Sequence, residues 1–130
     1  MSVQEEALRL RRCGYNCAQS VLAALGSYTG LDEKTALSVA GGFGGGVRCG
    51  EICGAASGAV MALGLAFPYA HVDDAEAKAR IAKLAMTMNR DYSNQFGCIR
   101  CQDLKRNGIS CEELIAWAAK HAEEIIKENL

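Results

Sequence analysis

Residues 51–67, EICGAASGAVMALGLAF, form an almost wholly apolar or small stretch, and Pro68 follows it directly. A helix with no polar face is typical of a segment that other parts of the protein, or lipid, cover on all sides. The run is about 16 residues long, shorter than the roughly 18–20 residues that a membrane-spanning helix needs. The stretch therefore predicts a buried central helix that ends at the proline, and it predicts no membrane insertion.

Small residues dominate this predicted helix, and Gly54 and Gly58 lie four positions apart. Residues at that spacing share one face of a helix. Without large side chains on that face, a second helix can pack closely against it. The same face leaves room for a homodimer.

The sequence on both sides of this stretch carries helical patterns and no strand signals. Alanine is abundant, and apolar residues recur at spacings of three and four. Asp32, Asp73 and Ser110 suit the N-cap positions of helices. The predicted helices cover residues 3–12, 16–28, 32–40, 51–67, 73–94 and 110 onward, with a short helix or turn at 98–106. We expect one domain over residues 1–130, an all-α compact bundle of about five to six helices.

Composition narrows the classes of function. The chain has 130 residues, enough for one hydrophobic core without disulfide bonds. Its formal charge of −1 offers no electrostatic attraction to nucleic acid or to an anionic membrane. The N-terminal MSVQEE lacks the basic and apolar segments of a secretory signal. We therefore expect a cytoplasmic protein whose thiols stay reduced.

A glycine-rich segment precedes the apolar stretch. Six of the ten residues 41–50, GGFGGGVRCG, are glycine. A glycine-rich turn before a helix can hold phosphate on its backbone N–H groups. However, no GxGxxG is present, and Glu51 stands where a P-loop requires lysine. We interpret the segment as a tight connection that lets the following helix begin with its cysteines facing inward.

Seven cysteines stand out in a chain that needs no disulfide, and the odd number prevents complete pairing within one chain. Cys111 is alone, and the other six form the pairs Cys13/Cys17, Cys49/Cys53 and Cys98/Cys101. Each spacing is one helical turn, which would place both thiols on one face, too far apart for a local disulfide in a regular helix. The CxxC of residues 98–101 is the exception, because a helix start favours a redox-active dithiol there.

Other known cysteine motifs fit less well. Covalent haem needs histidine after the second cysteine of a CxxC, but Gln102 follows Cys101. The spacing matches a zinc ribbon only weakly and a ferredoxin run not at all, so the tertiary fold would have to assemble any metal site. The two histidines also give little signal, because His71 is expected in a turn and His121 on the solvated surface of the last helix.

Several motifs together resemble a known family. They are the CAQSVL that begins at Cys17, the glycine run ahead of CGAASG at 53–58, and then Phe96, Cys101 and Cys111. This arrangement resembles the redox-active protein family named for its C_GCAxxG_C_C cysteine pattern. The resemblance spans about residues 14–118, and its most specific part is the CGAxxG of residues 53–58.

The resemblance implies a small helical protein of bacteria or archaea with a redox or metal role centred on four cysteines. The positions that match the family pattern are Cys17, Cys53, Cys101 and Cys111, which become the candidate catalytic residues. Each of the three extra cysteines lies one helical turn before one of them. We therefore expect the four to converge on a single site.

Two functional hypotheses remain open. In the first, Cys53 approaches Cys17, Cys101 or Cys111 across helices, and the pair cycles between dithiol and disulfide with an unidentified redox partner. The dipole at the start of the helix would favour a Cys53 thiolate, and Arg48 and Arg100 could add positive charge.

The second hypothesis is a binding module without turnover. In it, cysteines bind an iron–sulfur cluster or a soft metal ion, and the ligands come both from the four family positions and from among the three extra cysteines. The candidate ligands are Cys17, Cys49, Cys53, Cys98, Cys101 and Cys111. A third, structural reading is a dimer in which the cysteines are merely buried.

Overall fold

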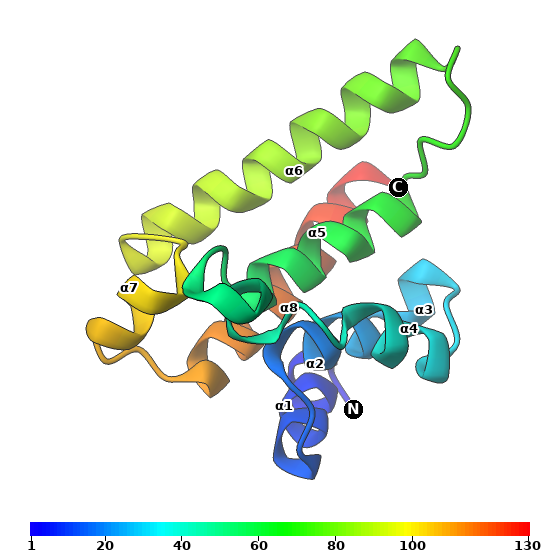
Figure 1. Ribbon diagram of the computed structural model, residues 1–130. Coiled ribbons are helices and arrows are strands. Elements are labelled where there is room, and N and C mark those ends of the chain that lie inside the picture. Colours follow the sequence, from blue (N-terminus) through cyan, green and yellow to red (C-terminus); the bar gives the residue numbers. More distant parts are fainter.

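The computed structural model describes residues 1–130 and consists of helices joined by turns and loops (Figure 1). The all-α class is confirmed, but the chain forms nine helices rather than five to six. They are α1 (Val3–Cys13), α2 (Cys17–Ala24), α3 (Gly26–Thr29), α4 (Glu33–Ala40), the π-helical turn η1 (Gly46–Gly50), α5 (Gly54–Ala66), α6 (Ala75–Phe96), α7 (Cys101–Arg106) and α8 (Cys111–Asn129). The additional helices are short ones, because the predicted helix 16–28 breaks at Leu25 and the glycine segment contains η1.

Side-chain caps fix where most helices begin. Ser2, Asn16, Asp32 and Ser110 each accept a hydrogen bond from a backbone N–H in the first turn of the helix that follows. The cap of α6 is Asp74 rather than the expected Asp73, and its side chain accepts from the N–H of Ala77. Local capping chemistry therefore sets these boundaries to within a residue or two.

The helix α5 packs against α2, α3, α6 and α8. Its buried residues are Gly54, Ala55, Ala56, Gly58, Ala59, Ala62 and Leu63. The expected helix over residues 51–67 is shorter in the structure, and it is not buried all round. Leu65 is 39% exposed, and Met61 and Gly64 border an open groove beside α4. This side stays open because α4 does not reach across it.

Glycines bring α5 into direct contact with α2. A Cβ added to Gly58 would lie 2.8 Å from the carbonyl oxygen of Ala18, and one added to Gly54 would lie 3.2 Å from the Ala18 nitrogen. Both distances are shorter than ordinary van der Waals contact, so a side chain at either position would force the helices apart. The two helices therefore meet backbone against backbone at the ends that carry Cys17 and Cys53.

An aromatic cluster joins α6 to α8. Tyr92 and Phe96 from α6 make edge-to-face contacts with Trp117 of α8. The ring of His121 stacks on Trp117 at 4.4 Å between centroids, and its Nε2 lies 2.8 Å from Oδ2 of Asp91. The expectation of a solvated His121 is therefore wrong, because this stack and the carboxylate leave its side chain only 22% exposed.

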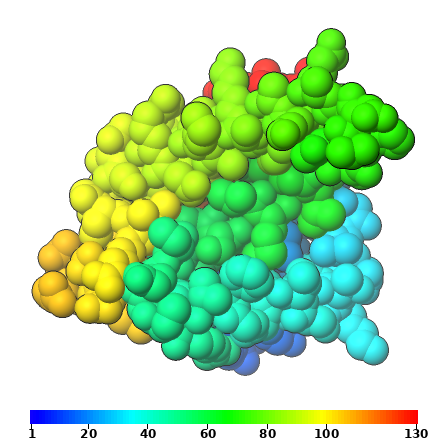
Figure 2. Space-filling model, turned by 45° about the horizontal axis from the view of Figure 1, so that its top comes forward, coloured from blue at the N-terminus to red at the C-terminus, as the bar shows by residue number.

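The elements that will form the candidate site lie at one end of the bundle. η1 contacts α7, and Figure 2 shows the glycine segment at the surface beside the yellow and orange residues around α7. None of the helices combines the length and the apolar character that crossing a membrane would require.

Candidate functional site

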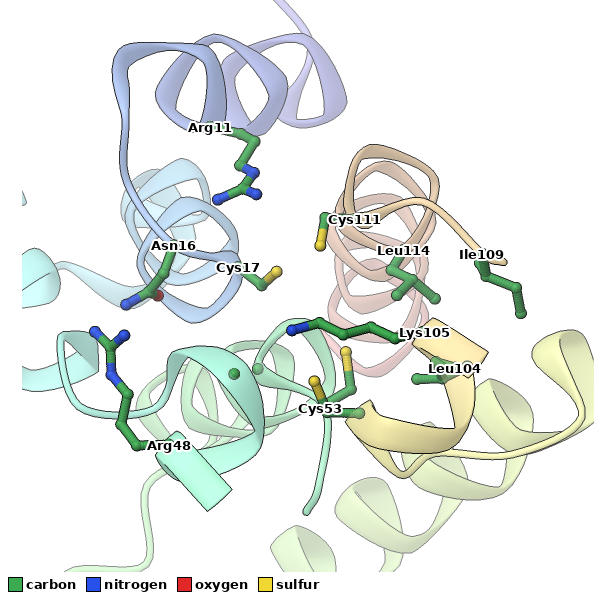
Figure 3. A pocket seen from close by; sticks show the side chains of 13 residues that line it. Arg11, Asn16, Cys17, Arg48, Cys53, Leu104, Lys105, Ile109, Cys111 and Leu114 are labelled. Carbon is green, nitrogen blue, oxygen red and sulfur yellow. The ribbon is translucent and has the colours of Figure 1, made fainter. Parts of the chain in front are cut away.

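A cavity of about 230 Å³ lies where the first residues of several helices meet, and four cysteines line it (Figure 3). Cys17, Cys101 and Cys111 are the first residues of α2, α7 and α8, and Cys53 is the N-cap residue of α5. We call these four the pocket cysteines. Helix N-termini carry partial positive charge, which favours a thiolate over a thiol. The fold therefore gathers four thiols at the N-terminal ends of four helices.

Different contacts bring the pocket cysteines together. A Cβ on Gly54 would lie 3.3 Å from the Cβ of Cys17, so the glycine contact between α2 and α5 sets Cys53 beside Cys17. An isolated antiparallel bridge between Ile52 and Arg100 joins the segments that lead to Cys53 and Cys101. In it the Cys53 N–H donates to the Ile99 oxygen at 2.9 Å, and the Cys101 N–H donates to the Glu51 oxygen at 2.6 Å.

The glycine segment closes over these residues in an uncommon conformation. Val47 and Arg48 have φ angles of 57° and 60°, values that residues with a side chain rarely adopt. A Cβ on Gly46 would lie 2.8 Å from the Cβ of Cys101, so only glycine lets the loop lie against that cysteine. Nη2 of Arg48 donates to the Gly41 oxygen at 3.0 Å and holds the loop closed.

Cys17 and Cys111 are the first residues of α2 and α8, and their thiols point toward one another at the cavity (Figure 3). The neighbouring Cys17 thiol lowers the pKa of Cys111 to about 6; burial opposes this shift, and the charges of Arg11 and Lys105 add to it. The neighbouring Cys111 thiol, together with burial, raises the pKa of Cys17. The arrangement therefore favours a thiolate at Cys111 over one at Cys17.

Cys53 lies deeper and ionises less readily. It is 2% exposed, and this burial raises its pKa, although the Tyr92 hydroxyl and the N–H groups of Ala55 and Ala56 act in the opposite direction. Tyr92 Oη donates to Cys53 Sγ at 3.0 Å. The helix start acts as expected, because the N–H groups of Ala55 and Ala56 lower the pKa of Cys53, but loss of solvent outweighs them.

The remaining three cysteines, Cys13, Cys49 and Cys98, do not line the cavity, and we call them the outer cysteines. Cys13 and Cys49 are exposed and Cys98 is partly so. The expectation that each sequence pair shares one helix face is wrong. A helix end separates each pair: Cys13 is the last residue of α1, Cys49 belongs to η1 before α5, and Cys98 precedes α7.

The metal alternative names six cysteines as candidate ligands, and the structure brings four of them to the cavity. Cys49 and Cys98 lie elsewhere. No group of three or more Cys, His, Asp or Glu side chains is arranged so that it could hold a metal ion. His71 is exposed, and its Nδ1 accepts from the backbone N–H of Asp73.

The positive charge of the site comes partly from residues that the sequence did not single out. Arg48 lines the cavity, but Arg100 instead pairs with Glu51 at 2.7 Å. Arg11 and Lys105 also line it and were missed. Lys105 lies four positions after Cys101 on α7, so helical spacing could have pointed to it.

One family model matches this chain over residues 15–125, and its description reads "Putative redox-active protein (C_GCAxxG_C_C)". The match confirms the resemblance that the cysteine motifs suggest. Neither a curated protein nor a solved structure matches the chain.

Proposed function

The chain belongs to the C_GCAxxG_C_C family, described as redox-active, and from this premise we propose that it is a thiol–disulfide exchange protein. In this proposal Cys111 is the attacking thiol and Cys17 is the resolving thiol. The observation that carries it is that these two thiols line one cavity and point toward one another from α2 and α8 (Figure 3). The lowered pKa of Cys111, about 6, agrees with this arrangement. A thiol whose pKa lies near the ambient pH is close to the optimum for attack on a disulfide.

The exchange proceeds in two balanced steps. The Cys111 thiolate attacks one sulfur of a substrate disulfide, so that a mixed disulfide forms and one substrate thiolate leaves. Cys17 then attacks Sγ of Cys111 and gives its proton to the departing side. The second substrate thiol is released, and a Cys17–Cys111 disulfide remains. The protein loses two electrons and the proton of Cys17, and the first substrate thiolate takes a proton from solvent, so that the substrate disulfide becomes two thiols.

Accessibility supports the division of roles. Cys111 is partly exposed, whereas Cys17, Cys53 and Cys101 are buried. A substrate disulfide can therefore reach Cys111 first, and the buried Cys17 lies beside Cys111 for the second step. Arg11 and Lys105 also favour the thiolate of Cys111.

Cys53 and Cys101 complete the proposal as a second dithiol. The bridge between Ile52 and Arg100 sets them next to each other, and the contact of Gly54 with Cys17 places Cys53 beside Cys17. Exchange between the pairs needs no further oxidant: Cys53 attacks Sγ of Cys17 and frees Cys111, and Cys101 then attacks Sγ of Cys53 and frees Cys17. The disulfide thereby moves to the buried pair.

Exchange with a neutral small disulfide tests the proposed function. Fully reduced protein is mixed with 2-hydroxyethyl disulfide under nitrogen, and free thiols, released mercaptoethanol and disulfide-linked peptides are measured. We expect the protein to lose two thiols at first and to yield a peptide that links Cys17 to Cys111. We expect Cys111→Ser to slow the first step on the order of 100-fold.

Cys13→Ser is the matched control, because it removes an outer cysteine and leaves the cavity intact. Its rate should equal that of the wild type. Equal rates for Cys111→Ser and the wild type would overturn the proposal. So would anaerobically purified protein that is coloured and contains inorganic sulfide, because the pocket thiols would then be cluster ligands.

A further inference from the structure

Positive charge surrounds the cavity of the pocket cysteines, and no acidic residue lines it. The lining includes Arg11, Arg48 and Lys105 but neither aspartate nor glutamate. Arg11 donates one hydrogen bond to the Tyr15 oxygen at 3.2 Å, and Arg48 donates one to the Gly41 oxygen at 3.0 Å. Both guanidinium groups therefore retain N–H donors for another partner.

These three cations differ from most arginines outside the cavity in that they make no ion pair. Apart from Arg80, every arginine outside the cavity pairs with a carboxylate: Arg9, Arg12, Arg90, Arg100 and Arg106. None of the three cations that line the cavity makes an ion pair. A protein with a formal charge of −1 thus keeps three positive groups unneutralised at one site.

The close-up shows where these groups point (Figure 3). The Lys105 side chain extends from α7 so that its ammonium group lies between Cys17 and Cys53. The guanidinium group of Arg11 reaches from α1 toward Cys17, whereas that of Arg48 lies beside Asn16, farther from the thiols. A negative group held among them would lie beside the thiol pair of Cys17 and Cys111.

We propose that the substrate of the exchange reaction is a small anionic disulfide that carries carboxylate groups; this inference rests on the proposed function. Its carboxylates bind Lys105 and the two arginines, and one sulfur then lies within reach of Cys111. Drug-sized ligands occupy pockets of roughly 300–1,000 Å³. The cavity of about 230 Å³ therefore admits a molecule of modest size. The reaction is the exchange described above, in which the anionic disulfide is reduced to two thiols.

Three small disulfides of different charge test the substrate class. They are dithiodiglycolate with two negative charges, 2-hydroxyethyl disulfide with none, and cystamine with two positive charges. Rates with wild-type protein are compared with rates for Lys105→Glu and for Lys120→Glu, an exposed lysine outside the cavity. Both variants change the net charge equally. Both disulfides react with the same Cys111 thiolate. The ratio of the dithiodiglycolate rate to the cystamine rate is therefore independent of how much of Cys111 is ionised in each variant.

We expect Lys105→Glu to lower this ratio on the order of 10-fold or more, and Lys120→Glu to leave it near the wild-type value. The wild-type ratio should fall as salt is added, because ions screen the attraction. An equal ratio in the two variants would overturn the substrate class while leaving the exchange function intact. A failure of all three disulfides to react would overturn the exchange function itself.

An alkylation experiment separates these failures. The same Cys111 thiolate attacks iodoacetate and iodoacetamide, which differ in charge. Mass spectrometry resolves the alkylation of Cys111 from that of the other cysteines. We expect the ratio of the iodoacetate rate to the iodoacetamide rate to fall in Lys105→Glu but not in Lys120→Glu. If Lys105→Glu leaves the ratio of the iodoacetate rate to the iodoacetamide rate unchanged, the cavity is not an anion site. That conclusion holds whatever the rates with the three disulfides are.

Discussion

The pocket cysteines and the outer cysteines are close in sequence and opposite in environment. Each outer cysteine precedes a pocket cysteine by three or four positions, yet Cys13 and Cys49 are exposed while Cys17 and Cys53 are buried. The difference arises because a helix begins at the second member of each pair or immediately after it. The pocket cysteines belong to helix starts, whereas the outer cysteines belong to the segments that lead into them.

The hydrogen bonds of the two groups differ in the same sense. Cys53 receives its bond at 3.0 Å from Tyr92, a wholly buried side chain. Cys13 and Cys98 meet Arg9 and Asn107 at 3.9 and 4.0 Å near the surface. The burial and hydrogen-bond partners of a thiol in this protein thus depend on whether it lies at a helix start, and not on its spacing from the next cysteine.

The largest expected effect concerns the ionisation of Cys111. Its low pKa depends first on the neighbouring Cys17 thiol, so Cys17→Ala should raise the pKa from about 6 toward the 8.5 or so of a free cysteine. The wild-type thiolate therefore persists down to about pH 6 and is protonated below it. The variant should lose its thiolate at a pH up to about 2.5 units higher. The measurement is the pH dependence of iodoacetamide modification at Cys111.

Cys17→Ser is the conservative control for this prediction. A serine hydroxyl can donate a hydrogen bond, so the midpoint should stay nearer to that of the wild type than in Cys17→Ala. Cys13→Ser, at an outer position, should not move it. A midpoint that is the same in Cys17→Ala and wild type would show that the Cys17 thiol does not set the ionisation of Cys111.

A smaller effect is expected when the contact between α2 and α5 is loosened. The Cβ of Gly58→Ala would lie 2.8 Å from the Ala18 oxygen, which is backbone and has little freedom to move. Crowding of this kind costs about 1–3 kcal/mol of unfolding free energy. We also expect faster alkylation of Cys17 and Cys53 and unchanged alkylation of the outer cysteines. Urea denaturation and thiol-resolved mass spectrometry measure the two effects.

Gly64→Ala is the matched control on the same helix, because a Cβ there would meet nothing within 4 Å. It should hold or increase the stability, since alanine is the better helix former by roughly 0.5–1 kcal/mol. Equal stability losses for the two alanine variants would argue against the close backbone contact.

The smallest expected effect comes from removing one hydroxyl. Tyr92→Phe deletes the hydrogen bond to Cys53 and should lower the unfolding free energy by about 1 kcal/mol. The pKa of Cys53 should rise further, because this bond opposes the effect of burial. Tyr69→Phe changes a tyrosine that is 39% exposed and should leave the stability unchanged. Trp117 fluorescence during urea denaturation measures both variants, and equal midpoints would contradict the prediction.

Much of the fold could be predicted from local chemistry. Asn16, Asp32 and Ser110 are N-cap residues, and Gly14 and Gly97 end α1 and α6 in the left-handed conformation. These features depend on a few neighbouring residues, which the sequence displays directly. The interruption of the helix at Leu25 and the left-handed conformation of Val47 and Arg48 depend on packing between distant segments. No local sequence pattern predicts them.

The candidate site shows the same division. The family pattern picks out four cysteines that the structure places around one cavity. The sequence indicates the effect of the helix start on Cys53 but not the burial that outweighs it, because burial depends on the whole fold. Arg11 and Lys105 were missed because neither belongs to a motif, and only the meeting of α1, α7 and α8 gives them a shared role.

The thiol pair of Cys17 and Cys111 has a consequence for the unfolded chain. A disulfide between these residues would enclose a loop of roughly 95 residues, almost three quarters of the chain, and on the chain-entropy account such a closure stabilises the fold by about 4–5 kcal/mol. Oxidation would therefore restrict the denatured ensemble more than any local cross-link could. By the same thermodynamic cycle, folding makes that disulfide harder to reduce, so the redox state and the conformational stability of this chain are coupled quantities.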